Sequence, residues 1–161
     1  MKEDILPHIA ALGRVVSGVY ILTARDADGA ATAMLASWVQ QAAFLPLCVS
    51  VAMAKDRPAY EVVKRSGSFV LSVLGKDDAP LMKRYARGVK SGEDPFAGVN
   101  VNTTPTGQPY LADALGWVEC RLTRALEFGA DHDLLIGEVT GAQVIKEGQP
   151  FTHVRGSAYH Y

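Results

Sequence analysis

The chain has 161 residues, a length typical of one domain with a single substantial core. Lys and Arg number 16 against 17 Asp and Glu, so the formal net charge is −1. This balance excludes a broad electrostatic attraction for nucleic acid or for an anionic membrane, and any bound anion must be held locally. Hydrophobic residues at 48 % and charged residues at 20 % exclude disordered, collagen-like and disulfide-scaffold proteins.

Neither the amino-terminal stretch nor the cysteines indicate an extracellular protein. The stretch 1–12 mixes acids and a proline with its apolar residues and does not match a signal peptide. No run approaches the roughly 18 apolar residues of a membrane span. Cys48 and Cys120 lie in predicted strands without C-x-x-C spacing, which favours buried, reduced thiols. We therefore expect a cytoplasmic protein.

Hydrophobic spacing in the first half of the chain alternates between strand and helix patterns. Asp56 is suited to cap a helix that starts at Pro58. The predicted elements are a helix over 4–14, a strand over 17–23, a turn at 26–29, a strand over 33–39, a buried strand over 47–53, a helix from Pro58 to about Ser66, a strand over 69–74 and a helix over 79–87.

The second half is predicted to be almost entirely strand and loop. Residues 91–110 are rich in Gly, Pro, Asn and Thr and predict a long loop. Strands follow over 117–128, where polar and apolar residues alternate, over 134–145 with a bend at Gly141, and over 151–154. Many strands, few short helices and no βαβ alternation predict one mainly β domain over 1–161, an antiparallel barrel with helices outside.

Several motifs that mark large enzyme classes are absent. There is no G-x-G-x-x-G after a first strand, no Walker A sequence, no H-E-x-x-H and no G-x-S-x-G. These absences argue against Rossmann enzymes, P-loop hydrolases, zincins and α/β-hydrolases. The four histidines form no i,i+4 pair, although His153 and His160 can converge in space, and we expect no metal site.

Three segments are candidates for chemistry, each with an ordinary alternative. His132 lies in a polar turn before an apolar strand, where it faces a ligand or only solvent. Lys55 and Arg57 flank the junction of a buried strand and a helix, which is either an anion site or a solvated turn. Small residues over 33–39, with Met34 and Trp38, form either a slot for a flat ring or plain core.

Taken together and in order, six segments resemble the flavin reductase-like family, whose fold is the FMN-binding split barrel. The most similar form is the module at the carboxyl end of multidomain flavodiiron proteins. The segments are residues 11–14, 32–39, 51–57, 69–71, 92–99 and 131–139. No single segment is diagnostic, but six in the right order are hard to obtain by chance.

The resemblance implies a homodimer that binds FMN, with FAD as the alternative flavin. It implies that Met34, Leu35, Ala36, Ser37 and Trp38 line the isoalloxazine, that Gln41 can reach its polar edge, and that Ala52, Met53, Ala54, Lys55, Asp56 and Arg57 complete the site, the turn from Ala54 holding the phosphate. It also implies that His132 lies near a nicotinamide, in a pocket completed by Tyr159 or His160.

The implied activity is that of an NAD(P)H-dependent flavin reductase, in which hydride passes from NADH or NADPH to flavin N5. His132 orients the nicotinamide, and no essential general acid is expected. One alternative is an FMN-carrying electron-transfer module that serves a flavodiiron or similar acceptor protein without oxidising NAD(P)H. Another is a ligand-binding barrel without redox work. The sequence leaves open the preferred nucleotide, the final electron acceptor and whether the flavin exchanges.

Overall fold

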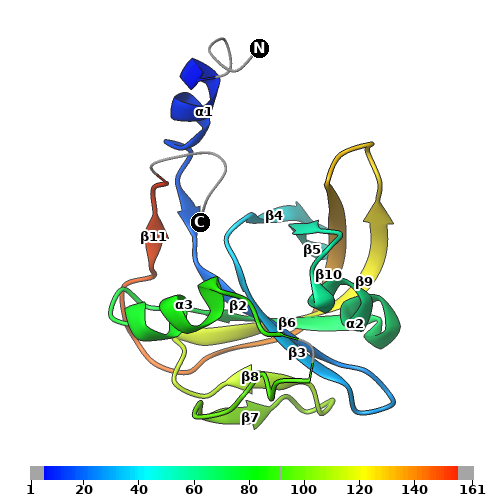
Figure 1. Cartoon of the computed structure of the whole chain (residues 1–161). Helices are drawn as coiled ribbons and strands as arrows, with labels where there is room; N and C mark the ends of the chain where they lie inside the picture. Colours follow the sequence, from blue (N-terminus) through cyan, green and yellow to red (C-terminus); the bar gives the residue numbers. More distant parts are fainter. Residues whose placement is uncertain (1–5, 91, 156–161) are drawn as a thin grey trace.

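The computed structural model describes residues 6–90 and 92–155 (Figure 1). Strands dominate, and the three helices of the described residues are short. In chain order the elements are α1 (Leu6–Leu12), β1 (Ser17–Gly18), β2 (Tyr20–Arg25), β3 (Ala31–Ala36), β4 (Val39–Phe44), β5 (Leu47–Ala54), α2 (Pro58–Ser66), β6 (Ser68–Val73), α3 (Ala79–Ala86), β7 (Val101–Thr103), β8 (Pro109–Leu111), β9 (Gly116–Leu126), β10 (His132–Val144) and β11 (Thr152–His153).

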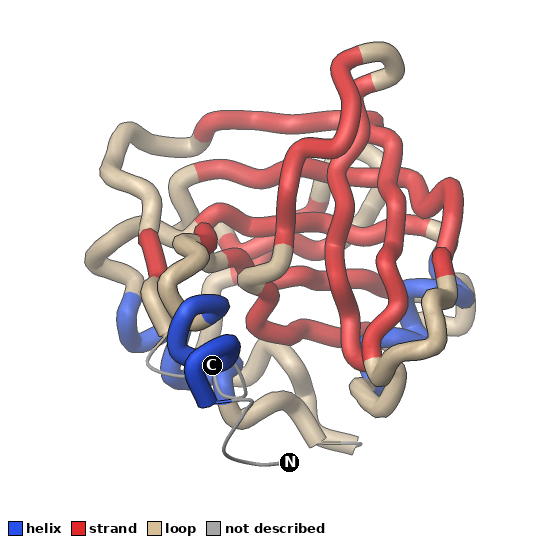
Figure 2. Tube along the Cα trace, turned by 90° about the horizontal axis from the view of Figure 1, so that it is seen from above, coloured by secondary structure: helices blue, strands red, loops and turns tan. Residues whose placement is uncertain are grey.

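Seven strands form one sheet in the order β3-β2-β6-β9-β10-β5-β4, and every neighbouring pair is antiparallel. The two edge strands, β3 and β4, follow each other directly in the chain and are joined only by Ser37 and Trp38. The sheet is strongly curved, as the view from above shows (Figure 2). The expected antiparallel, mainly β architecture is thus confirmed, with the barrel open where β3 passes into β4.

The interior of the curved sheet is apolar, and α2 closes one of its ends. Pro58 occupies the first turn of α2, and Gly67 ends the helix with φ +67°, a conformation that glycine adopts without strain. Val62 and Val63 of α2 pack with Leu22, Met53, Phe69, Leu71 and Leu135 from the sheet. Burying these side chains supplies most of the stabilisation of such a barrel.

A second apolar cluster lies on the other face of β2 and β3, beneath α3 and β8. It contains Ile21, Ala33, Leu74, Tyr85 and Leu111, all almost fully buried. The Tyr85 hydroxyl donates a hydrogen bond to the carbonyl oxygen of Pro95 at 2.9 Å. This cluster fixes the end of α3 against β3, which matters for the site described below.

Two sequence predictions of strand boundaries are wrong. The predicted single strand over 33–39 is two strands, since β3 ends at Ala36 and β4 begins at Val39, and β4 itself was not predicted. Its central residues are exposed, so the sequence lacks the alternation that marks a half-buried strand. The predicted loop over 91–110 contains β7 and most of β8, which pair with each other as a hairpin.

The expected bend at Gly141 is confirmed as a shift of register between β9 and β10, and a second shift occurs between Ile136 and Gly137. A Cβ atom at Gly137 would lie 2.7 Å from side-chain atoms of both Cys120 and Phe69, so glycine is needed there. Cys48 and Cys120 are buried free thiols, as predicted. Among the described residues, no helix is long and apolar enough to cross a membrane.

Candidate functional site

The turn between β5 and α2 is the centre of the site. Arg57 precedes the first helical residue in an extended conformation, and no side chain caps the helix. The expected capping role of Asp56 is therefore wrong, because Arg57 rather than Asp56 holds the N-cap position. The turn is fixed by its backbone, since the Lys55 amide donates to the Asp131 carbonyl at 3.1 Å. Pro58 has no N–H, and the Tyr60 N–H donates to the Arg57 carbonyl at 2.9 Å. The Ala59 N–H and the cations Lys55 and Arg57 therefore remain as the groups that suit a bound anion.

His132 lies beside this turn, at the first position of β10, where it pairs with Ala54. Its side chain is 17 % exposed, and its Nδ1 lies 3.0 Å from a carboxylate oxygen of Asp131. The hydrogen bond from His132 lowers the pKa of the Asp131 carboxyl. The same contact fixes the orientation of the imidazole ring.

Trp38 packs against His132 and makes this end of the site aromatic. The two ring centroids are 4.9 Å apart, and the guanidinium carbon of Arg155 lies 5.0 Å from the Trp38 ring centre. The Trp38 carbonyl accepts a hydrogen bond from the Ala52 amide at 3.0 Å, which ties the link between β3 and β4 to β5. The neighbouring Ser37 hydroxyl is buried and has no partner among the described residues.

The buried carboxylate of Asp133 contacts the turn between β5 and α2 from the barrel interior. Asp133 follows His132 but points to the opposite face of β10, and its side chain is inaccessible to solvent. It accepts a hydrogen bond from the Tyr60 hydroxyl in the first turn of α2, and Lys55 Nζ lies 3.5 Å from its other oxygen. The bond to Asp133, followed by burial, raises the pKa of Tyr60 to about 12. Asp133 thus connects β10, the turn and α2.

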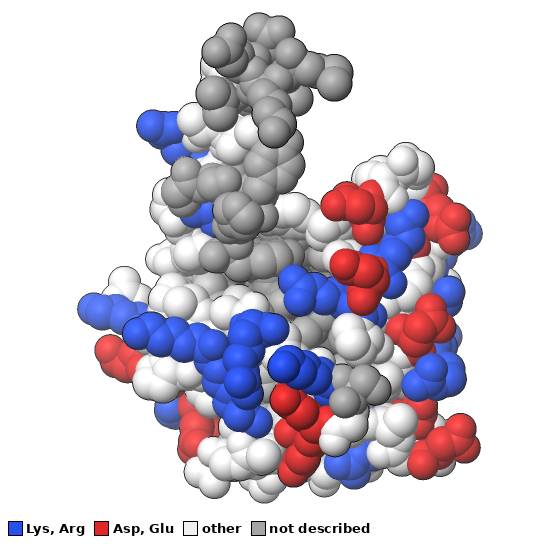
Figure 3. Space-filling model, viewed as in Figure 1, with Lys and Arg blue, Asp and Glu red and all other residues white. Residues whose placement is uncertain are grey.

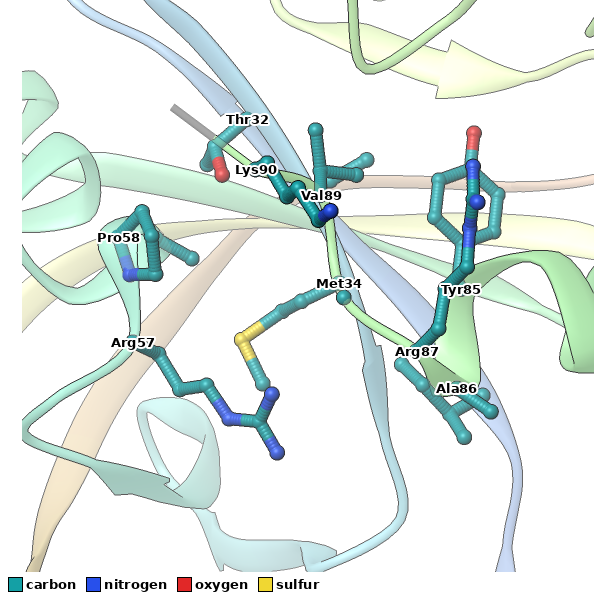
Figure 4. Close-up of a pocket in the computed structure, with 13 residues that line it drawn as sticks. Thr32, Met34, Arg57, Pro58, Tyr85, Ala86, Arg87, Val89 and Lys90 are labelled. Atoms are coloured by element: carbon teal, nitrogen blue, oxygen red, sulfur yellow. The ribbon is translucent and has the colours of Figure 1, made fainter. Parts of the chain in front are cut away.

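On the other side of Arg57 lies a cavity of about 240 Å³ between β3, α2 and the end of α3 (Figure 4). Its three charged lining residues, Arg57, Arg87 and Lys90, are all cations. Figure 3 shows Lys and Arg side chains gathered on this face, over α3 and towards α2. The lining is Thr32, Ala33, Met34, Leu35, Arg57, Pro58, Ala59, Tyr85, Ala86, Arg87, Gly88, Val89 and Lys90. A near-neutral protein therefore has a locally cationic cavity.

The structure brings most of the predicted residues together in one row. His132 and Trp38 lie at one end, the residues from Ala52 to Asp56 in the middle, and Met34, Leu35 and Arg57 at the cavity. Gln41 lies apart on β4, where its amide donates to the Ala43 carbonyl at 3.4 Å. Ala36 is buried beside Ser37, and the Met53 side chain is buried in the barrel interior. Tyr159 and His160 lie outside the described residues.

Sequence reasoning did not single out the far wall of the cavity. Arg87 and Lys90 follow α3, and cations at a helix end are ordinarily explained by the helix dipole. Gly88, at φ +76°, was the available signal, since it marks a sharp turn of the chain between them. A Cβ atom there would lie 3.4 Å from Arg57 Nη1, so this glycine lets the guanidinium pack against the backbone.

Comparison with known proteins agrees with this arrangement. Residues 12–161 match the model of the flavin reductase like domain. The chain belongs to this family. It is 39 % identical over 153 residues to diflavin flavoprotein A 1 of Synechocystis, covering 94 % of this chain and 26 % of that protein. The chain thus spans about a quarter of the length of such curated relatives.

Solved structures of flavin reductases share the fold. The flavin reductase PheA2 superposes with a TM-score of 0.80 at 25 % identity, over 97 % of this chain and 95 % of that one. The NADH:FAD oxidoreductase SgcE6 of Streptomyces globisporus C-1027 has a TM-score of 0.84 at 23 % identity, over 96 % and 90 %. The split-barrel prediction is therefore confirmed, and the chain is a flavin reductase like domain.

The residues present fit a flavin. The cavity and the uncapped start of α2 supply the positive charge that a flavin phosphate requires. The buried, unpaired hydroxyl of Ser37 leaves a hydrogen-bonding group in the segment expected to line the ring.

Proposed function

We propose that this domain is an NAD(P)H-dependent flavin reductase that holds FMN along the turn between β5 and α2. The observation that carries the proposal is the row formed by the Trp38 and His132 rings, the turn and the cavity with Arg57. An aromatic end and a cationic end, joined by the turn from Ala54 to Arg57, complement a molecule with a flat ring at one end and a phosphate at the other.

The protein contributes binding and orientation. Arg57 and the Ala59 N–H at the start of α2 hold the phosphate, while Asp133 fixes the Lys55 side chain at the same turn. The segment from Met34 to Trp38 supplies backbone amides and apolar contact along the ring. His132, oriented by Asp131, positions the nicotinamide. When bound, the flavin supplies the redox chemistry by accepting hydride from the reduced nicotinamide.

Anaerobic mixing tests the proposal directly. The purified protein is loaded with FMN, and the visible absorption of the oxidised flavin is followed after NADH or NADPH is added. Bleaching at catalytic rates with either nucleotide is the expected result. Bound flavin that neither nucleotide reduces, but that a chemical reductant does, contradicts the reductase activity.

That contrary result would favour a second function, an electron-transfer module that receives or delivers electrons through a protein partner. Two observations favour it. The chain covers about a quarter of the diflavin flavoproteins that it matches, so an acceptor can reside in other domains. The Trp38 ring also packs against His132 and so occupies one side of the imidazole that is expected to contact the nicotinamide.

A homodimer is part of the proposal and is supported by apolar side chains at two hairpin ends. Phe44 ends β4 and is 81 % exposed, and Leu45 follows it and is 95 % exposed. Leu126 ends β9, and both Leu126 and Phe128 are also exposed. Exposed apolar groups of this size are typical of interfaces between subunits. Light scattering gives the mass, and Leu45→Glu is expected to convert a dimer into monomers.

A further inference from the structure

The cationic cavity has two walls, and a single phosphate uses only one. The first wall is the start of α2 with Arg57, where the proposed flavin phosphate binds. The second is the chain from Tyr85 to Lys90, which carries Arg87 and Lys90. Neither of these two side chains forms an ion pair with any residue in the described part of the chain. Two unneutralised cations thus face the space beyond the first wall.

The ordinary explanation, neutralisation of a helix end, does not account for both cations. Lys83 and Arg84 already lie in the last turn of α3, where they complement the helix dipole. Arg87 is the capping residue, and Lys90 lies three positions beyond it. The nearby carboxylate of Glu93 accepts a hydrogen bond from the Lys90 backbone amide at 3.3 Å, and Glu93 does not line the cavity.

The size of the cavity also exceeds the needs of one phosphate. Its volume of about 240 Å³ approaches the roughly 300 Å³ at which pockets for small-molecule ligands begin. Arg57 reaches from the first wall to the second, because a Cβ atom at Gly88 would lie only 3.4 Å from its Nη1. An anion bound at Arg57 therefore leaves room, and uncompensated positive charge, on the side of Arg87 and Lys90.

We infer that Arg87 and Lys90 form a second phosphate subsite, which takes a further phosphate group of a nucleotide bound at this site. This inference rests on the proposed function, since the first phosphate is that of the flavin. Two ligands can supply this further phosphate group: FAD through its adenylate phosphate, or NADPH through its 2′-phosphate. The first source gives the domain a preference for FAD over FMN, and the second gives it a preference for NADPH over NADH.

The test compares Arg87→Ala, Lys90→Ala and the double variant with Lys83→Ala, an exposed cation of α3 that does not line the cavity. Affinities for FMN, FAD, ADP and 2′,5′-ADP are measured by titration, and KM is measured for NADH and NADPH. Loss of charge-assisted hydrogen bonds is expected to weaken the responsible ligand about ten- to hundredfold in the double variant. Lys83→Ala is expected to change each value less than about twofold.

The pattern of losses identifies the source. A loss for FAD and ADP, with FMN unchanged, assigns the subsite to the adenylate phosphate. A loss for 2′,5′-ADP and a raised KM for NADPH, with NADH unchanged, assigns it to the 2′-phosphate. Equal losses for FMN and FAD with an unchanged NADPH to NADH ratio overturn the inference, as does no loss at all. Failure of the proposed function is detected by a separate measurement: the wild-type protein would then bind no FMN.

Discussion

The two ends of the site are built in opposite ways. At the aromatic end, Trp38 and His132 pack against each other and the charged groups have close partners, since Asp131 contacts His132 and Arg155 lies on Trp38. At the cationic end, Arg57, Arg87 and Lys90 surround an open cavity without an acid among its lining residues. Packing therefore orients groups at the first end, and unbalanced charge attracts ligand at the second.

The largest expected effect is at the cationic end. Arg57→Glu replaces a cation by an anion next to the proposed phosphate, and FMN affinity is expected to fall about a hundredfold. Riboflavin, which lacks the phosphate, is expected to bind within about twofold of its wild-type affinity. Fluorescence titration of both flavins measures this. Arg124→Glu, an exposed change on β9, is the charge-matched control, and equal losses for the two flavins would refute the phosphate site.

A smaller and different effect is expected at the aromatic end. His132→Ala removes the group that positions the nicotinamide, and kcat/KM for the reduced nucleotide is expected to fall about tenfold, the worth of one good hydrogen bond. The FMN dissociation constant is expected to stay unchanged. Stopped-flow reduction of FMN-loaded protein gives the first value and titration the second. Unaltered hydride transfer in this variant rules out the role of His132.

Ionic strength distinguishes the cationic end of the site from the aromatic end without a mutation. Raising ionic strength from about 0.05 M to about 0.5 M screens exposed cations, so FMN affinity is expected to fall several-fold. Riboflavin affinity, which depends on packing at the aromatic end, is expected to change little. Titrations of both flavins across this range provide the measurement, and parallel salt dependence would show that charge does not distinguish the two ends.

The smallest effect concerns the contact between Asp131 and His132. Because the folded pKa of Asp131 is lowered, its stabilising contribution is present above the ordinary carboxyl pKa near 4 and is lost as the pH falls through the folded value. Asp131→Asn is expected to lower Tm slightly at pH 5.5, and the difference from wild type is expected to shrink as the pH is lowered. A difference that grows as the pH falls is inconsistent with this linkage. Thermal unfolding monitored by circular dichroism provides the data.

The elements that the sequence predicts well are those with strong local signals. The boundaries of α2 agree because Pro58 marks its start and Gly67 its end. β4 was missed because Gln40 and Gln41 lie on an exposed edge strand, whose pattern carries no hydrophobic periodicity. Strands of three residues such as β7 and β8 are too short to show an alternation of polar and apolar residues.

One part of the candidate site could be predicted from the sequence and another could not. The residues from Ala54 to Arg57 are contiguous, so the sequence alone indicates that this turn can bind an anion. The cations Arg87 and Lys90 reach the same cavity only because the cluster around Tyr85 docks the end of α3 against β3. That proximity depends on the path of the whole chain, which no local pattern encodes.

One feature of β10 limits how such domains vary in length. His132 faces the site while Asp133 faces the interior, because neighbouring residues of a strand point to opposite sides. Extra residues in the exposed connection 127–131 leave this pairing intact. One residue inserted directly after His132 would turn the side chains from Asp133 to Ile136, ahead of the first shift of register, to the wrong face of the strand. Related chains are therefore expected to gain or lose residues ahead of His132 and to keep their length after it.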